Sequence, residues 1–228
     1  MESTQLDNPV WHALNGRHRH LAEVCGVVRR YPAACAPFIA VPAADVPLDD
    51  EVLRRGEGAA GAYFLGVLPQ DLPAAWRFRS RSAVLQMVPP RQAALPDGAI
   101  TVSELGPADH RAMLSLAQLA FPDFFRPRTC ELGTYLGIFA DGRLVAMAGE
   151  RMAFDGFQEI SGVCTHPDHL GRGHARRLTQ ALLQRHRGLG LESFLHVSEG
   201  NTAARRLYEA MGFSVRAALP MGQLETIV

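Results

Sequence analysis

Apolar and polar positions form their clearest pattern in the second half of the chain. Residues 99–105 alternate between apolar and polar side chains as a strand does, and residues 106–121 carry apolar side chains near helical spacing. Residues 135–166 predict three strands, because Asp141-Gly142 and Asp155-Gly156 are the two-residue turns expected of hairpins. We therefore expect this part of the chain to form one strand, then helical structure, and then three antiparallel strands joined by two hairpin turns.

Helices and strands alternate after the third of these hairpin strands. Apolar residues at helical spacing share one face of a predicted helix that ends near His186, and residues 193–198 predict a strand. A further helix over residues 201–211 ends before Gly212, where a left-handed C-terminal cap is expected. The order β-α-α-β-β-β-α-β-α-β predicts a mixed α+β fold with a central mixed, largely antiparallel sheet.

The N-terminal part of the chain is less regular. It contains ten of the fifteen prolines, and residues 87–98 (MVPPRQAALPDG) read as a connector that fits neither a helix nor a central strand. Residues 61–68 and 82–88 are apolar runs of strand length, and helical patches precede them. We therefore predict an N-terminal α/β domain at residues 1–96 and a second domain at residues 97–228.

Composition and charge narrow the class of protein. The 228 residues are 47% hydrophobic, and 23 Lys and Arg balance 23 Asp and Glu, so the formal net charge is zero. A general nucleic-acid binder usually has a basic excess, and no apolar run is long enough to predict a membrane span. The four cysteines lack CxxC spacing, which favours reduced thiols. Because the start of the chain shows no secretory pattern, we expect a cytoplasmic protein without nucleic-acid or membrane partners.

One glycine-rich stretch, HLGRGHARRL at residues 169–178, places two glycines around an arginine before a predicted helix. Unpartnered N–H groups and the helix dipole make a helix start positive, and glycines let a phosphate approach the backbone closely. Arg172 and Arg176 are four residues apart, so we expect both on one helix face. The stretch matches neither the Walker loop nor the dinucleotide-binding motif. It predicts a phosphate site of another kind, with a plain turn as the alternative.

The motifs VCTHPDHLGRGHARRL and NTAARRLYEAMGF together resemble the GNAT superfamily of acyl-CoA-dependent N-acetyltransferases. The family's loop motif, Gln/Arg-x-x-Gly-x-Gly/Ala, corresponds to residues 170–175, and the resemblance spans residues 97–220. Leu170 stands where the family usually has Gln or Arg, but the family's pyrophosphate contacts are mostly backbone amides. The resemblance implies a GNAT-type acyl-CoA N-acyltransferase fold for this part of the chain.

The resemblance also implies which residues contact acetyl-CoA, the expected co-substrate, with no metal ion. The strand that carries Val163 and Thr165 should splay from its neighbour and offer backbone groups to the pantetheine arm. Asn201 should contact the same arm, although Asn is also favoured as a plain N-cap. The expected coenzyme-binding residues are Val163, Cys164, Thr165, Leu170, Gly171, Arg172, Gly173, His174, Ala175, Arg176, Asn201 and Tyr208.

Two side chains are candidates for the chemistry of acyl transfer. In the family, the tyrosine of the LYEAMGF motif is the usual general acid for the departing thiolate, which gives that role to Tyr208; its spacing also fits a core aromatic. Alternation places Glu159 on one strand face with Val163, so Glu159 is the candidate base, with Glu150 in reserve and a solvent-exposed charge as the alternative. A backbone N–H of residues 163–164 is the expected oxyanion donor. Cys164 has no evident catalytic partner, so we expect direct attack rather than an acyl-enzyme.

The predicted function is transfer of an acetyl group from acetyl-CoA to a primary amine by direct attack in a ternary complex. One alternative is a longer or aromatic acyl donor, because EGNTAARRLYEAMGF also resembles the glycine N-acyltransferase-like branch. Another is a non-catalytic acyl-CoA sensor. The acceptor, a small molecule or a peptide, should be selected by loops such as residues 120–133, where Phe124, Phe125 and Arg126 are candidates to line the pocket. The sequence leaves open whether the protein forms a homodimer.

Overall fold

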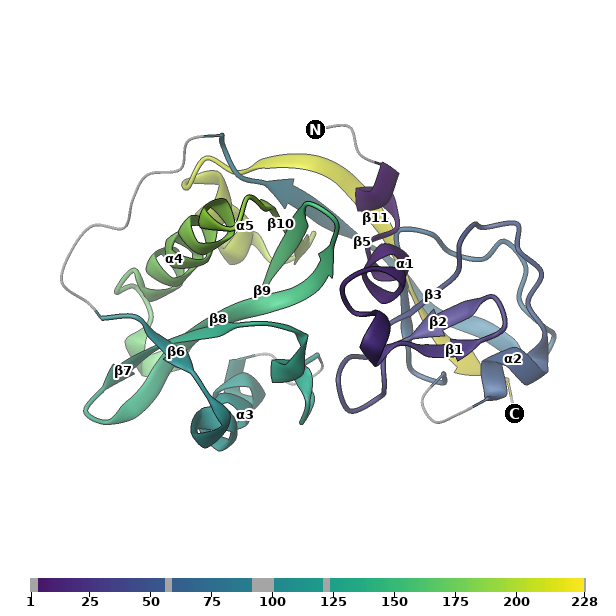
Figure 1. Ribbon diagram of the computed structural model, residues 1–228, viewed down its shortest axis with the longest axis horizontal. Helices are drawn as coiled ribbons and strands as arrows, with labels where there is room; N and C mark the ends of the chain where they lie inside the picture. The colour runs from purple at the N-terminus through teal and green to yellow at the C-terminus, as the bar shows by residue number, and fades with distance from the viewer. Residues whose placement is uncertain (1–3, 56–58, 92–100, 121–123, 228) are drawn as a thin grey trace.

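The computed structural model describes residues 4–55, 59–91, 101–120 and 124–227 of the chain. Two sheets organise these residues (Figure 1). In chain order the strands are β1 (Glu23–Cys25), β2 (Val28–Arg30), β3 (Ile39–Ala40), β4 (Tyr63–Leu65), β5 (Trp76–Val88), β6 (Ser103–Leu105), β7 (Tyr135–Ala140), β8 (Arg143–Phe154), β9 (Phe157–Thr165), β10 (Glu192–Ser198) and β11 (Ser214–Thr226).

Ten helical segments connect these strands within the described residues. The α-helices are α1 (Pro9–Asn15), α2 (Asp50–Arg54), α3 (His110–Ala120), α4 (His174–Gly188) and α5 (Thr202–Glu209). Short 3-10 helices are η1 (Thr4–Asp7), η2 (Arg19–Leu21), η3 (Pro107–Asp109), η4 (Thr129–Leu132) and η5 (Pro167–His169). A single α-helix, flanked by 3-10 turns, therefore stands where the sequence order predicted two helices before the hairpin series.

The large sheet has eight strands in the order β4-β11-β5-β10-β9-β8-β7-β6. Strands β6 to β9 are antiparallel, β9 and β10 are parallel, and β10, β5, β11 and β4 are again antiparallel. The two predicted hairpin turns are confirmed, with positive φ angles of 49° and 73° at Asp141 and Gly142 and of 77° at Gly156. The expected mixed, largely antiparallel sheet is therefore present.

Helices cover both faces of the sheet around β7 to β10. One face packs Leu178 and Leu182 of α4 and Tyr208 of α5 against Ile138 and Leu195. The other face packs α3 against β8 and β9 through a separate apolar cluster. Figure 1 shows α4 and α5 on one side of β8 and β9 and α3 on the other. Because the two helical layers bury the sheet from both sides, the ends of β9 and β10 are held rigidly where the candidate site forms.

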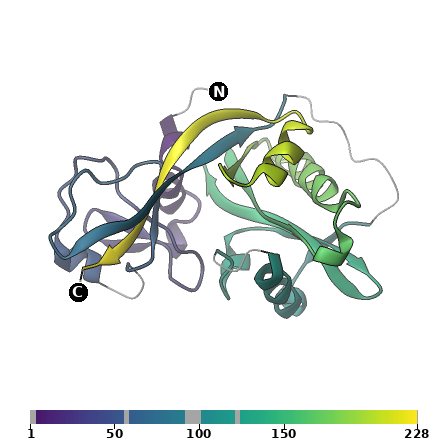
Figure 2. The same cartoon turned by 180° about the vertical axis from the view of Figure 1, so that it is seen from behind.

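Strand β5 comes from the N-terminal part of the chain but lies between β10 and β11, which come from the C-terminal part. It is far longer than the predicted run at residues 82–88, and it pairs with β11 from Trp76↔Thr226 to Ser214↔Val88. Figure 2 shows β5 and β11 side by side, running from the N-terminal side of the molecule toward α5. One sheet therefore joins the two predicted domains, while their predicted border at residue 96 lies outside the described residues.

The small sheet β1-β2-β3 and helix α1 complete the N-terminal side of the molecule. Leu6, Val10 and Leu14 of η1 and α1 are buried against Phe154 and Phe194 of the large sheet. The predicted helical sequence within residues 8–26 is α1, and the predicted strand within residues 61–68 is the shorter β4. No helix in the described part of the chain is long and apolar enough to cross a membrane.

Candidate active site

The parallel pair β9 and β10 opens into a wedge. The two strands pair from Glu192↔Phe157 to Leu195↔Ile160, and beyond Ile160 they pair with different neighbours. Strand β10 continues against β5, with His196 opposite Gln86, whereas β9 continues against β8. The predicted splay of this strand is thus confirmed, and it leaves one edge of β9 facing an open cavity instead of β10.

A β-bulge lies where β9 leaves β10. The register of β8 and β9 shifts between Gly149↔Ser161 and Met147↔Cys164, and Gly162 has a φ of 62°. A Cβ on Gly162 would lie 3.1 Å from the ring of Tyr135, so a larger residue would meet both backbone strain and crowding. Bulges re-aim backbone groups beside functional sites. This bulge adjoins residues 163–164, from which a backbone N–H was the expected oxyanion donor.

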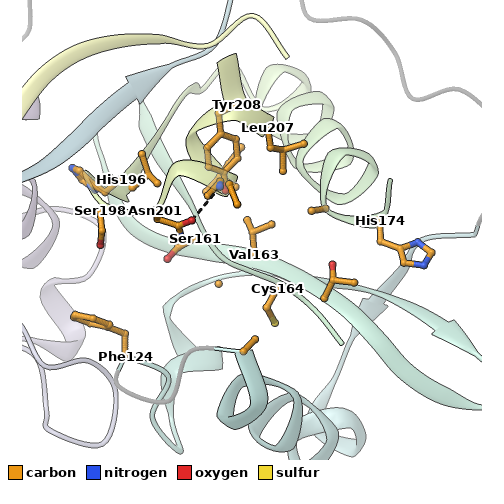
Figure 3. A pocket seen from close by; sticks show the side chains of 18 of the residues that line it. Phe124, Ser161, Val163, Cys164, His174, His196, Ser198, Asn201, Leu207 and Tyr208 are labelled. Atoms are coloured by element: carbon orange, nitrogen blue, oxygen red, sulfur yellow. Dashed lines mark hydrogen bonds between the residues drawn. The ribbon is translucent and has the colours of Figure 1, made fainter. Parts of the chain in front are cut away.

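A cavity of about 880 Å³ follows the wedge from the start of α4 to the N-terminal part of the molecule. Every residue expected to bind the coenzyme lines this cavity. In Figure 3, His174 lies at one end, Val163 and Cys164 lie in the middle, and Phe124, His196 and Ser198 lie at the opposite end. The structure thus brings together residues from β9, the glycine-rich loop and α5 that are up to 45 positions apart, from Val163 to Tyr208.

The glycine-rich loop ends at the first turn of α4. Gly171 and Gly173 have φ angles of 75° and 76°, and a Cβ built on either would meet nothing within 4 Å. The backbone there is open to a ligand, and the loop fits a diphosphate by its bare N–H groups and the positive helix end. The prediction that Arg172 and Arg176 share a helix face is wrong, because α4 begins at His174 and Arg172 precedes it.

Asn201 and Tyr208 face the cavity from α5 (Figure 3). The Asn201 side chain accepts a hydrogen bond from the Ala204 N–H over 3.1 Å, so it caps the helix while lining the cavity. Tyr208 is 6% exposed, and its ring packs against Phe213 with centroids 5.5 Å apart. Burial raises the pKa of Tyr208 to about 12, so the phenol stays protonated at neutral pH. Both residues therefore have structural contacts and also line the cavity.

Glu159 does not occupy the place expected of a base. Its side chain is fully buried and does not line the cavity. It accepts from Arg151 Nε at 2.9 Å and Arg151 Nη2 at 2.5 Å, and it pairs with His196 Nδ1 at 2.8 Å. Burial alone would raise its pKa, but Arg151 and His196 lower the pKa to about 2. A carboxylate held this strongly in the charged form is a poor proton acceptor, so its surroundings argue against the expected role.

The reserve base, Glu150, also points elsewhere. It lies in a second cavity of about 400 Å³, and its carboxylate contacts His186 Nε2 at 3.1 Å and the Thr134 N–H at 2.9 Å. Burial would raise its pKa, but these two partners and Arg185 lower it. Since Glu150 does not line the larger cavity, it tethers α4 to β8 rather than facing an acyl group.

Of the three candidate residues in the loop expected to select the acceptor, one lines the cavity. Phe124 lines it, whereas Phe125 is buried against Tyr135 and Arg126 lines a different hollow. Residues 121–123 of this loop lie outside the described residues.

Burial raises the pKa of the cavity residue Cys164 to about 12, which keeps its thiol protonated and argues against an acyl-enzyme.

Arg151, His196 and Gln86 were not singled out by sequence reasoning. Arg151 and His196 line the cavity, and Gln86 is fully buried behind His196. The sequence feature that could have revealed this cluster is Arg151, a charged residue within the apolar strand sequence LVAMAGERMAF. A buried charge requires a partner, so a strand arginine of this kind predicts a nearby carboxylate.

Among the described residues, no group of three or more His, Cys, Asp or Glu side chains is placed to hold a metal ion.

Comparison with solved structures decides the family. An acetyltransferase of the GNAT family from Novosphingobium aromaticivorans is 31% identical to this chain, with a TM-score of 0.87, and the match covers 99% of this chain and 100% of that one. The chain belongs to the GNAT superfamily. Residues 135–219 also match the FR47-like protein family. These residues hold β7 to β10, α4 and α5, so the family match includes both motifs that carried the sequence resemblance.

Two curated relatives match a shorter part of this GNAT protein. The L-amino acid N-acyltransferase MnaT of Escherichia coli is 33% identical over 78 residues, which is 33% of this chain and 45% of that protein. The L-methionine sulfoximine/L-methionine sulfone acetyltransferase of Salmonella typhimurium is 33% identical over 78 residues, 33% of this chain and 46% of that protein. Each match spans less than half the length of the curated relative. The GNAT assignment and the fold therefore rest on the full-length structural match.

Proposed function

We propose that this GNAT protein transfers an acetyl group from acetyl-CoA to a primary amine by direct attack within a ternary complex. The observation that carries the proposal is the cavity along the β9–β10 wedge, which every expected coenzyme residue lines. Its two ends differ in chemistry, with bare backbone and arginines near α4 and aromatic side chains near Phe124. One end suits a diphosphate and the other a small organic acceptor.

In this proposal the coenzyme lies along β9 as an additional strand would. The N–H groups of the loop before α4 bind the diphosphate, and the unpaired edge of β9 near Val163 and Thr165 binds the pantetheine arm. The thioester carbonyl then lies beside the bulge, where a backbone N–H of residues 163–164 stabilises the oxyanion. Cytoplasmic location is part of the proposal, and the four free cysteines suit a reducing compartment.

Tyr208 supplies the proton in this mechanism. The amine attacks the carbonyl carbon, the C–S bond breaks as the tetrahedral intermediate collapses, and the phenol protonates the departing thiolate. A protonated phenol is required at that moment, and the burial of Tyr208 keeps it protonated. The proton that the amine loses passes through water and returns to the phenolate of Tyr208, because Glu159 and Glu150 are both committed to other partners.

A thiol-release assay tests the proposal. The purified chain is titrated with acetyl-CoA, then mixed with a panel of primary amines while free thiol is followed. We expect saturable binding and amine-dependent thiol release. Failure to bind acetyl-CoA contradicts the proposal, and binding without release for any amine supports the sensor alternative. Propionyl-CoA and benzoyl-CoA run in parallel, and faster release from either supports the alternative acyl donor.

A further inference from the structure

The guanidinium of Arg151 lies at the acceptor end of the cavity. Arg151 is on β8, its side chain is 15% exposed, and it lines the cavity with Phe38 and Phe124. Its guanidinium lies over the Phe38 ring, 4.9 Å from the centroid, and Phe38 stacks on Phe124 with centroids 6.1 Å apart. Figure 3 places Phe124 at the end of the cavity opposite His174. A cation beside an aromatic wall therefore faces the region left for the acceptor.

The carboxylate that partners Arg151 faces away from the cavity. Glu159 has no exposed surface, and its two oxygens receive four donors: Arg151 Nε and Nη2, His196 Nδ1, and the Met152 N–H at 3.2 Å. Within the described residues, the Nη1 group of Arg151 has no hydrogen-bond partner. The ion pair thus presents its positive member to the cavity, with one edge of the guanidinium fork available.

His196 and Gln86 hold this ion pair in place. The amide of Gln86 is oriented from both ends, because Oε1 accepts from Arg216 at 2.8 Å and Nε2 donates to the Leu6 carbonyl at 2.9 Å. Gln86 Nε2 therefore also donates to His196 Nε2 at 3.0 Å, which leaves Nδ1–H to donate to Glu159. Both ring nitrogens are occupied, so His196 acts as a positioning residue. The orientation of Arg151 is fixed before any acceptor arrives.

We propose that Arg151 binds a carboxylate of the acceptor, so that the substrate class is a small amino acid with an apolar side chain. The inference rests on the proposed acetyl transfer. Arginine matches carboxylates through two parallel N–H···O bonds, and its planar fork can bind one carboxylate at each edge. Glu159 takes the edge formed by Nε and Nη2, and the acceptor takes the edge that carries Nη1. Phe38 and Phe124 then contact the acceptor's apolar side chain.

Matched acceptors test the recognition of the carboxylate. Rates of thiol release are measured for methionine, methionine amide and 3-(methylthio)propylamine with the full chain at saturating acetyl-CoA. The three share an amine and a thioether side chain and differ at the carboxylate. We expect kcat/KM for methionine to exceed that for the amide by roughly 10- to 100-fold, as for a hydrogen bond to a charged group. The measurement is repeated at two salt concentrations, because the charge contribution should weaken as salt rises.

Variants test whether Arg151 causes the preference. Arg151→Gln alone would leave Glu159 buried and unpaired, so the main variant is Arg151→Gln with Glu159→Gln. Arg151→Lys is the second variant, because it keeps a cation beside Glu159 and loses the fork. We expect the methionine-to-amide ratio to fall toward one in the double variant and at least several-fold in Arg151→Lys. Glu159→Gln alone retains the arginine but loses part of its anchor, so it should reduce the preference less than the double variant does.

Arg30→Gln is the matched control. Arg30 is also a buried arginine paired with a glutamate, at 2.7 Å from Glu23, but it lies outside the large cavity. Its substitution should leave the methionine-to-amide ratio as it is in the unaltered protein. Acetyl-CoA affinity and circular dichroism establish that each variant is folded.

The outcomes separate the two proposals. Thiol release from amines and amino acids alike, with no preference for the carboxylate, overturns this inference and leaves acetyl transfer standing. A preference that survives unchanged in both folded Arg151 variants assigns the recognition to another residue and also overturns it. Absence of thiol release from every acceptor overturns the proposed function and this inference together.

Discussion

His196 Nδ1 donates to Glu159 Oε1 over 2.8 Å, and this contact joins β10 to β9 just before the two strands separate. Together with the two bonds from Arg151, it holds Glu159 as a buried anion at neutral pH. The family resemblance suggested a glutamate base at this strand position. In the structure, the oxygens of this carboxylate already accept hydrogen bonds from other residues. Its role is to orient the cation that faces the cavity.

The first prediction concerns the pH dependence of catalysis. If Glu159 is not the base, Glu159→Gln keeps the shape of the pH–rate profile, although the rates themselves change. The measurement is kcat/KM from pH 5 to pH 9, about the range in which the apparent pKa values of enzymes with a working base are seen. Loss of the limb on which the rate rises with pH would restore Glu159 as the proton acceptor.

The second prediction concerns stability. The folded pKa of Glu159, about 2, lies below that of an unfolded glutamate. Its ionisation therefore stabilises the fold above the unfolded pKa of about 4.3, and that contribution is lost as the pH falls toward the folded value. Glu159→Gln should lower the free energy of unfolding at pH 7 by about 3–5 kcal/mol, because it leaves Arg151 buried without a charge partner. Urea titrations at pH 7 and pH 3 measure the difference, which should be smaller at pH 3.

An exposed ion pair provides the control for this stability measurement. Glu131 bonds Arg128 over 2.7 Å at the surface, with 42% and 49% of the two side chains exposed. Glu131→Gln should cost under about 1 kcal/mol, as exposed pairs usually do. Equal losses for the two glutamates would contradict the structural role assigned to Glu159.

The third prediction separates chemistry from binding at Tyr208. Tyr208→Phe removes the phenolic proton but keeps the ring packed on Phe213, so kcat should fall by roughly 10²–10⁴-fold. The dissociation constant of acetyl-CoA should change little. Tyr31→Phe is the control, since Tyr31 is a buried tyrosine that bonds His18 outside the cavity. Equal losses of kcat and coenzyme affinity in Tyr208→Phe would indicate a structural tyrosine.

The fourth prediction tests the phosphate site at the helix start. Gly173→Asp places a negative charge where the diphosphate is proposed to bind, and it puts a side chain on a residue in the left-handed backbone conformation. The affinity for acetyl-CoA should therefore fall by at least about tenfold. Gly190→Asp is the matched control. Gly190 also has a positive φ, 69°, with open space around it, but it follows the other end of α4. Isothermal titration should show weaker binding for the first variant alone, and equal affinities would contradict the proposed site.

The predicted elements that the structure confirms are those encoded locally. The hairpins at Asp141 and Gly156, the glycine-rich entry to α4 and the Asn201 cap each depend on residues within a few positions of one another. Their conformations follow from turn chemistry and helix-end hydrogen bonding. The residues that the resemblance assigns to the coenzyme all line one cavity, because most of them lie on or beside these locally encoded elements.

Features that join distant segments could not be read in the same way. The position of β5 depends on pairing between Trp76 and Thr226, and no local pattern encodes that register. Likewise, the alternation of β9 placed Glu159 on the correct strand but could not reveal Arg151 across the hairpin. The sequence left Glu159 as a candidate base or an exposed charge, whereas the structure shows a buried, paired carboxylate whose partners are set by which strands lie side by side.

The position of β5 also bears on how the chain folds during synthesis. Its thirteen residues leave the ribosome before either of its sheet neighbours, β10 and β11, has been translated. In the nascent chain this segment therefore lacks both of the neighbours that pair with its edges in the folded sheet. Because its partners lie more than 100 residues later, closure is governed by long-range contacts and is intrinsically slow.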